Sequence, residues 1–519
     1  SQALGSWAVQ DERRASYARE VGALYHGYAR ELERLGRVDR ELYAWRALDA
    51  LRAAPGRWGA EPVFFYGFDD LTPLERDAVE TLARVANTQV TVSLTYEPGR
   101  AALIARAEAV EELRPFAERV HELPALDEHY VPRSRAVLHH LERELFSDDR
   151  PERVDPQGAV GLLEAGGERA EAELVAAEVL ELLRAGLPGE EIVIVYRSLS
   201  RIAPVIERVF GEYGIELAAE RAVPFARTAL GSGVLALVRC ALLDEPAAGA
   251  EDLLTYLRSP GLLERPELAD RLEVEIRQEG LRTAAQARAR LGWELEEIDA
   301  IRESSDPGSE LAWHARRLFA LPYRGSAPEL NSAEALDARA LARLLGALAE
   351  LEELGEILLG TELIELLESL EVADGVAFRP GAVVLAEPLA IRARRFRCAF
   401  VCGLQEGEFP LPGSPEPFLS DERRRELAAC VGLRLPSSED ALARERYLFY
   451  ACVSRATEQL VLSYRSSDEE GNLELASPFI ADVSDLLVEG WANRRRQRLL
   501  ADVVWPAENA PTARELARA

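Results

Sequence analysis

Apolar residues follow two alternating patterns along the chain. Short runs of consecutive apolar residues, such as Ile192–Tyr196, are separated by longer stretches in which apolar residues recur every three or four positions. Continuous runs are typical of parallel strands covered by helices on both faces, and the spaced pattern is typical of amphipathic helices. We therefore predict an α/β fold with one mainly parallel sheet that contains Val160–Leu163, Ile192–Tyr196, Val383–Leu385, Ala399–Cys402 and Leu460–Ser463.

The same patterns divide the chain into five segments. Residues 1–155 hold two short apolar runs and then polar helical sequence, which predicts the later part of one α/β domain and a helical crossover. Residues 156–245 and 376–480 carry the five runs, so we predict that they form a second α/β domain in two parts. Residues 246–375 are helical and interrupt this domain as an insertion, and residues 481–519 form a linker and helical tail.

Composition indicates the class of protein and its compartment. With 519 residues, 48% of them hydrophobic and 29% charged, the chain is long enough for two to four globular domains. No apolar run approaches the length that spans a membrane, and no signal peptide opens the chain, so we expect no membrane association. The five cysteines are scattered, which favours buried thiols in a reducing, cytoplasmic location over disulfides.

The net charge of −29 is unusual for a nucleic-acid-binding protein, because such proteins are usually basic. All 61 basic residues are arginines, and an acidic chain can still hold DNA in a local groove of arginines. One candidate is the run Trp491–Arg498, in which Arg494, Arg495 and Arg496 are placed to contact phosphates. The alternative is that this run is the solvated face of a helix.

Two sequence patterns lie in order between Ala382 and Tyr464. The first ends a predicted strand, and the second lies on a helix that we predict from about Asp440 to Ala456. They resemble the fifth and sixth motifs of superfamily 1 DNA helicases of the UvrD/Rep type, and more closely the B subunit of ATP-dependent deoxyribonucleases, the AddB type. The residues that carry the resemblance are Val401, Gly403, Leu404, Gly407, Phe409, Pro410, Leu448, Phe449, Tyr450, Ser454, Arg455 and Ala456.

This resemblance implies RecA-like parallel sheets, of the P-loop NTPase type, with a large helical insertion. It also implies that Arg455 is the catalytic candidate and lines a nucleotide cleft near Gly403 and Glu406. Taken alone, Arg455 is more typical of an arginine on the surface of a helix. Arg197, after a strand, is a second cleft candidate, against ordinary exposure at a strand end. Arg446 lies two and a half turns before Arg455 and is a further candidate for the nucleotide cleft. Because that spacing places it on the opposite side of the helix, the alternatives are that it packs within the protein or contacts DNA.

An acidic strand end precedes these motifs. The run from Pro62 ends in Gly67-Phe68-Asp69-Asp70, and a strand that ends in carboxylates can hold Mg²⁺ in a nucleotide-driven motor. The resemblance therefore makes Asp69 and Asp70 the metal candidates. The alternative is that Asp70 only caps the next helix, for which Thr72 is the predicted N-cap and Glu75 its capping-box partner.

The chain departs from active helicases in two places. It has no lysine, so it carries no G-x-x-x-x-G-K-[ST] phosphate loop, which in the family would lie upstream of residue 1. Active helicases also have a glutamate that contacts nucleotide before the strand of the fifth motif, and here Arg395 holds that position. Arg394 and Arg395 are therefore candidates for DNA contact. The AddB type departs similarly, which favours a motor-shaped subunit that scans DNA.

The resemblance predicts a function in DNA end resection and double-strand break repair and recombination, with single-stranded DNA or duplex ends as substrate. It implies ATP and Mg²⁺ as cofactors of the full-length protein and an AddA-like helicase–nuclease partner. Neither a PD-(D/E)XK nuclease site nor the cysteines of an iron–sulfur cluster is visible in this chain. The alternatives are an ATP-driven UvrD-like helicase whose ATP site is completed upstream, and a structural scaffold. We expect no ATP hydrolysis by this chain alone.

Overall fold

The computed structural model of the chain describes residues 12–36, 38–59, 61–68, 71–147, 151–219, 221–323, 329–355, 357–375, 378–413, 419–431, 435 and 437–519. The chain divides into two compact units. Residues 1–218 and 379–519 form the first, which we call the sheet unit, and residues 219–378 form the second, the helical unit.

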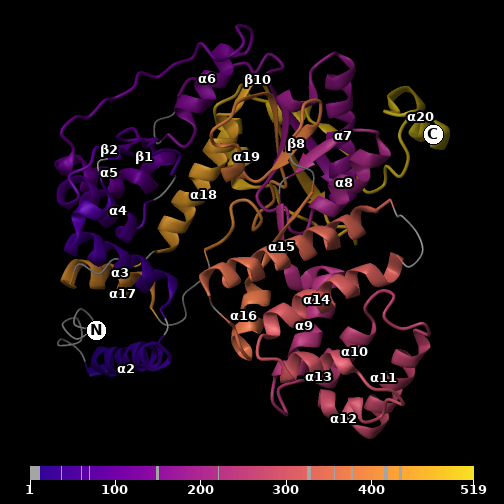
Figure 1. Ribbon diagram of the computed structural model, residues 1–519. Helices are drawn as coiled ribbons and strands as arrows, with labels where there is room; N and C mark the ends of the chain where they lie inside the picture. The colour runs from indigo at the N-terminus through magenta and orange to yellow at the C-terminus, as the bar shows by residue number, and fades with distance from the viewer. Residues whose placement is uncertain are drawn as a thin grey trace. The chain divides into compact units, whose positions relative to one another are not determined.

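A seven-stranded sheet is the centre of the sheet unit (Figure 1). Its order is β11-β3-β10-β9-β4-β8-β5, and the pairings from β11 to β8 are all parallel. The five predicted runs lie in this sheet, so the prediction of an α/β fold with one mainly parallel sheet is confirmed. The strands are β3 (Val160–Gly166), β4 (Ile192–Tyr196), β5 (Leu217–Ala219), β8 (Val383–Ala386), β9 (Phe396–Cys402), β10 (Ala456–Ser467) and β11 (Arg496–Arg498).

Helices cover both faces of this sheet because the chain crosses it in both directions. The connections β3–α7–β4 and β4–α8–β5 run one way along the strand order, and β9–α18–β10 runs the other way. Right-handed crossovers then place α7 and α8 on one face and α18 on the opposite face. All five residues of β4 are buried, as a strand covered on both faces requires. The helices are α7 (Glu168–Arg184), α8 (Ala203–Glu212) and α18 (Ser438–Val453).

Three phenylalanines hold the α18 face together. Phe409 follows β9, Phe449 lies on α18, and Phe479 lies on α19 (Pro478–Asp485). The ring of Phe409 meets both other rings edge-on, at 5.7 Å between centroids in each case, and the rings of Phe449 and Phe479 stack at 4.8 Å. Exposure of the three side chains is 0 to 2%. This cluster belongs to one continuous apolar core that also includes residues of α6 (Arg135–Glu144).

The amino-terminal part of the sheet unit contains a separate pair of parallel strands. These are β1 (Val63–Phe65) and β2 (Val90–Val92). Thr72 caps the next helix in a capping box with Glu75, as predicted. The helices of this part are α2 (Glu12–Leu35), α3 (Arg40–Ala53), α4 (Pro73–Glu80) and α5 (Ala107–Leu113), with a short 3₁₀ helix η3 (Ala101–Arg106).

The helical unit is built around α9 (Ala229–Leu242), of whose fourteen residues ten are buried. Asp337 accepts a hydrogen bond from the Leu230 N–H at 2.9 Å, which satisfies a donor in the first turn of α9. An antiparallel ribbon of β6 (Arg221–Pro224) and β7 (Glu371–Asp374) closes the unit. Its other helices are α10 (Ala250–Leu257), α11 (Glu267–Glu279), α12 (Ala284–Arg288), α13 (Glu296–Glu303), α14 (Pro307–Ala320), α15 (Ser332–Leu354) and α16 (Thr361–Ser369).

After β10 the chain returns along the sheet unit in short elements. A 3₁₀ helix, η9 (Trp491–Arg494), leads into the edge strand β11, and α20 (Ala513–Arg518) ends the chain. Within the residues described, no helix has both the length and the apolar character that a membrane crossing needs.

The phenylalanine cluster gives a stability prediction. Phe409→Ala should lower the free energy of unfolding by about 3–5 kcal/mol, because it leaves a cavity between two buried rings. Phe64→Ala, at a side chain that is 67% exposed, is the matched control and should change it by less than about 1 kcal/mol. Urea unfolding followed by circular dichroism measures both. Equal effects of the two changes would show that the cluster is not a core.

Candidate functional site

The turn after β9 depends on a glycine. Gly403 has φ +68°, and a Cβ there would lie 3.0 Å from the Cδ1 atom of Tyr196. A side chain is therefore disfavoured by both the backbone conformation and the space. The Gly403 N–H donates to Glu171 at 2.9 Å, and the Glu406 N–H donates to the Leu475 carbonyl at 2.9 Å. The turn is thus fixed on both sides, and the Glu406 side chain is exposed.

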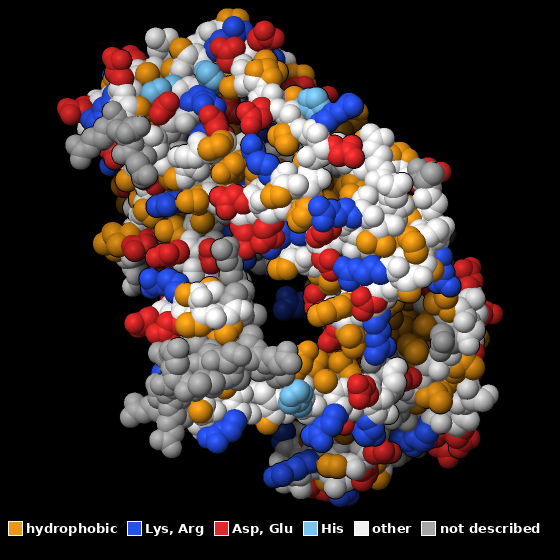
Figure 2. Space-filling view, turned by 90° about the vertical axis from the view of Figure 1, so that its left-hand side faces the viewer, with side chains coloured by type: hydrophobic (Ala, Val, Ile, Leu, Met, Phe, Trp, Pro, Cys, Tyr) orange, Lys and Arg blue, Asp and Glu red, His pale blue; other side chains and the backbone are white. Residues whose placement is uncertain are grey.

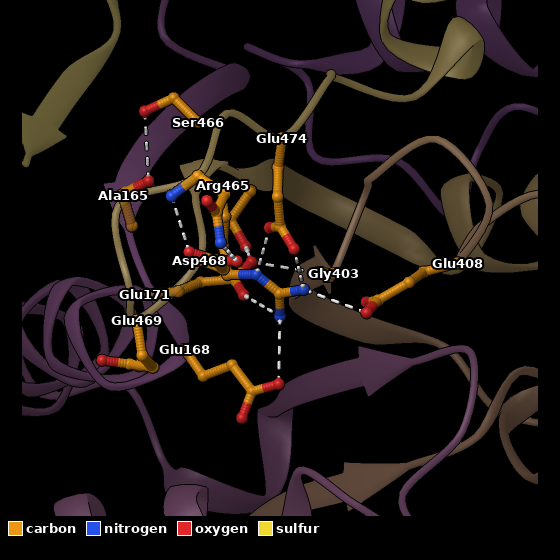
Figure 3. A network of polar contacts seen from close by, with 12 residues as sticks. Ala165, Glu168, Glu171, Gly403, Glu408, Arg465, Ser466, Asp468, Glu469 and Glu474 are labelled. Carbon is orange, nitrogen blue, oxygen red and sulfur yellow. Dashed lines mark hydrogen bonds and ion pairs between the residues drawn. The ribbon is translucent and has the colours of Figure 1, made fainter.

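A buried arginine occupies the carboxyl edge of the sheet beside this turn (Figure 3). Arg465, near the end of β10, is 2% exposed. It pairs with Glu474 at 2.9 Å and with Glu408 at 3.0 Å, and it lies 3.7 Å from Glu168 and 3.9 Å from Glu171. The carboxylates come from three separate segments, so the arginine ties α7, the turn after β9 and the segment after β10 together.

Glu171 is the most deeply buried of these carboxylates, at 1% exposure. One oxygen accepts hydrogen bonds from the Gly403 N–H and the Ser463 hydroxyl, and the other has no hydrogen-bond partner among the described residues. Burial raises the pKa of the Glu171 carboxyl above its ordinary value of 4.5. Arg465 does not reverse this shift, because its closer carboxylates are Glu474 and Glu408, and the neighbouring carboxylates raise the pKa of Arg465.

Arg455 lies at the other edge of the sheet. It stands between the end of α18 and the first residue of β10, and its carbonyl accepts the Phe396 N–H at the start of β9. Because α18 crosses the sheet face from the carboxyl edge to the amino edge, its last turn lies where the next strand begins. The strand from Phe396 to Cys402 separates the two edges by roughly 20 Å. The expectation that Arg455 lies near Gly403 and Glu406 is therefore wrong.

The Arg455 guanidinium is held by its neighbours. Its Nη1 group donates to the Arg392 carbonyl at 2.8 Å and its Nη2 group to the Ser454 hydroxyl at 2.9 Å. The Nε group is buried and has no hydrogen-bond partner among the described residues. Arg395 donates to the Ser454 carbonyl at 3.1 Å. Burial and the adjacent charge of Arg455 lower the pKa of the Arg395 guanidinium, so this edge holds two cations side by side.

The end of β1 lies close to the same edge. The Nε atom of Arg392 is 3.8 Å from the position that a Cβ would take at Gly67. The metal candidates Asp69 and Asp70 follow Gly67 directly after Phe68, and both lie outside the described residues. Within the described part of the chain, no group of three His, Cys, Asp or Glu side chains is placed to hold a metal ion.

The other cleft candidates are tied to α18. Arg197 donates to Glu445 from two nitrogens, Nε at 3.0 Å and Nη2 at 2.7 Å, and Glu445 is 6% exposed. Arg446 lies over the ring of Phe146, 5.7 Å from its centroid, on the phenylalanine side of the helix. The structure thus separates the predicted cleft residues into three places: Gly403 and Glu406 at one edge, Arg455 at the other, and Arg197 and Arg446 against α18.

The candidates for DNA contact are mostly engaged within the chain. Arg394 donates to the Glu190 carbonyl at 2.6 Å. The run from Trp491 is a 3₁₀ turn and an edge strand rather than a helix face. Arg495 pairs with Glu164 and Arg496 with Glu178, and Arg494 is exposed without an ion pair to any described residue. Arg395 remains the DNA candidate that lies beside another cation.

Sequence reasoning missed Arg465, Glu171 and Glu445. Each is a charged residue next to or within an apolar run, and a buried charge needs an ionic or hydrogen-bond partner. That signal marks the residues as paired, but it does not identify the partners, because those lie on distant segments.

The buried carboxyl predicts a pH dependence of stability. Because folding raises the pKa of Glu171, its contribution to stability is present below pH 4.5 and is lost as pH rises through the folded pKa. Between about pH 5 and 8 the unfolding temperature of the protein should fall more than that of Glu171→Gln. Glu406→Gln, at an exposed position, should follow the unsubstituted protein. Parallel profiles for all three proteins would contradict the assignment.

Comparison with known proteins gives relatives for most of the chain. No family model matches it. It is 26% identical over 91% of its length to the B subunit of an ATP-dependent helicase/deoxyribonuclease from Pelotomaculum thermopropionicum, and 28% identical over 90% to the one from Moorella thermoacetica. A segment of 102 residues is 38% identical to the corresponding B subunit of Bacillus thuringiensis.

The chain spans less than half of the Pelotomaculum and Moorella proteins, 45% and 47% of their lengths. Over about nine-tenths of its own length, the chain is therefore similar to the B subunits of ATP-dependent helicase/deoxyribonucleases.

Proposed function

We propose that this chain is the helicase-like portion of a DNA helicase–nuclease that acts in DNA end resection and double-strand break repair. It works as a motor-shaped subunit that scans single-stranded DNA or duplex ends. Its relatives are named as the B subunits of helicase/deoxyribonucleases, which supports an assembly with a further subunit. An AddA-like partner then supplies translocation, and ATP and Mg²⁺ serve the complete assembly.

The observation that carries the scanning role is the presence of an arginine, Arg395, beside Arg455. In the active helicases that the sequence resembles, this position holds a glutamate that contacts nucleotide. In this chain the Arg395 guanidinium lies there beside Arg455, and burial and the charge of Arg455 lower its pKa. A cation cannot accept a hydrogen bond from a ribose hydroxyl, whereas a glutamate can. Two neighbouring cations instead favour an anion such as phosphate. The edge has thus lost one contact that a motor of this type uses.

A specific observation favours the alternative of a UvrD-like helicase completed upstream. The Nε group of Arg455 is buried without a hydrogen-bond partner among the described residues, and Arg392 lies beside the end of β1. Arg455 makes two of the five hydrogen bonds that a guanidinium can donate, and the donors that remain suit a phosphate oxygen. The scaffold alternative is supported by the many arginines that are held in ion pairs. Acidic and basic side chains are interspersed over the face shown in Figure 2.

The scanning role predicts DNA binding without ATP turnover. The chain should bind a fluorescently labelled single strand of about twenty thymidines, measured by anisotropy, and the affinity should fall with salt with a slope of about 0.7 per neutralised phosphate. A scaffold should bind neither this strand nor a blunt duplex end, so an absence of binding at about 50 mM salt would contradict the proposal.

ATP turnover is the second test, and it needs both this chain and the full-length protein. Phosphoryl transfer needs a phosphate cradle, a metal site and an arginine together, so this chain should show no hydrolysis above background with single-stranded DNA present. Arg455→Ala should leave that background unchanged. In the full-length protein, loss of DNA-stimulated ATP turnover in Arg455→Ala but not in the exposed control Arg494→Ala would support the UvrD-like alternative. Hydrolysis by this chain alone would contradict both interpretations, because it would mean that the nucleotide site is complete without an upstream segment.

A further inference from the structure

A pocket of about 320 Å³ opens beside α18, away from the Arg455 edge. Five parts of the sheet unit form it: the end of η3, the end of β4, the 3₁₀ helix η8 (Pro388–Ile391), the segment 411–413 after β9, and the middle of α18. Its volume is within the range of small-ligand sites, which begins at roughly 300 Å³. None of the site residues that the sequence predicted, other than Arg197, lines it.

The walls of the pocket are mainly apolar. Leu389 and Leu411 are each 44% exposed at its rim, and Leu448 is half-buried. A Cβ at Gly413 would lie 3.3 Å from the Cβ of Ala441, so a side chain there would push the loop away from α18. Apolar walls of this kind exclude water from the faces of a flat ring, which favours a planar aromatic ligand.

A cation stacked on a ring forms one side of the pocket. Arg106 is 3% exposed, and its guanidinium carbon lies 3.0 Å from the centroid of the Tyr447 ring. Both residues line the pocket. Guanidinium planes and aromatic rings are the groups on which unpaired nucleobases stack in single-strand-binding proteins.

Arginines outnumber carboxylates among the described residues that line the pocket, although the chain as a whole is strongly acidic. Among the described residues, Arg106, Arg197 and Arg444 line it with a single carboxylate, Glu445. That carboxylate is already used, because it accepts Arg197 and the Leu411 N–H at 3.1 Å. The Nη1 group of Arg197 makes no hydrogen bond to a described residue, and Arg444 is exposed at the rim. These donors suit a phosphate group.

We infer that this pocket holds one nucleotide of single-stranded DNA. The base lies between Leu389, Leu411 and the Arg106–Tyr447 stack, and its phosphate faces Arg197 and Arg444. The inference rests on the proposed function for its substrate. It adds a DNA contact, in this pocket, that the resemblance to the family does not assign. The base would contact the apolar wall and the phosphate would contact the cations. Sites that bind single strands without sequence preference combine these two kinds of contact.

Matched leucine variants test the pocket. Leu389→Glu and Leu411→Glu place a carboxylate at the rim and should weaken binding of the labelled thymidine strand roughly tenfold, a typical loss for one stacked base. Leu442→Glu, on α18 but outside the pocket and 40% exposed, makes the same chemical change and should bind as the unsubstituted chain does. Arg444→Gln should reduce the salt slope by about 0.7.

Photo-crosslinking gives a second readout, which locates the strand on the chain directly. A strand that contains 4-thiothymidine should crosslink to the peptide containing Tyr447, and Leu389→Glu should reduce that crosslink with an unchanged unfolding temperature. If the chain binds the strand but all variants bind equally and no crosslink maps to α18, the pocket assignment is overturned and the proposed function stands. If the chain does not bind the strand, both fail. Equal displacement by free thymidine monophosphate would make the pocket a mononucleotide site and overturn the inference.

Discussion

A buried charge that must be neutralised holds the carboxyl edge of the sheet in one arrangement. Arg465 has almost no access to water, and leaving a guanidinium unpaired at such a site would cost several kcal/mol. It is surrounded by carboxylates from α7, from the turn after β9 and from the segment after β10. Those three segments can move relative to one another only by breaking ion pairs in a region of low dielectric. The turn after β9 is held in the same arrangement, because Glu408 pairs with Arg465 and Glu171 accepts the Gly403 N–H.

The direction of α18 decides where the other charges lie. A helix that connects two parallel strands must carry the chain from the carboxyl edge back to the amino edge, so Arg455 cannot lie beside Gly403 although both belong to neighbouring motifs. The two edges are chemically different as a result. The carboxyl edge is closed by Arg465 and its carboxylates, and the amino edge presents Arg395 and Arg455, neither of which forms an ion pair with a described carboxylate.

The strands and the capping box could be predicted from the sequence because they depend on local patterns. Continuous apolar runs such as Ile192–Tyr196 define buried strands, and Thr72 with Glu75 defines a helix start within four residues. Pairings between distant segments could not be predicted in this way. Glu171 and Gly403 are 232 residues apart, and Arg197 and Glu445 are 248 apart, so neither pair leaves a local signal. The prediction of where Arg455 lies was wrong for a related reason. The order of the motifs along the sequence does not determine at which edge of the sheet a residue lies.

One helix links the two positively charged places. Arg455 follows the last turn of α18, and Arg444 lies eleven residues earlier, about 16 Å along the axis, at the rim of the apolar pocket. Between them Phe449 and Cys452 are fully buried, which fixes the helix against the sheet. The packing of α18 therefore sets the separation between the Arg395–Arg455 edge and the Tyr447 wall of the pocket.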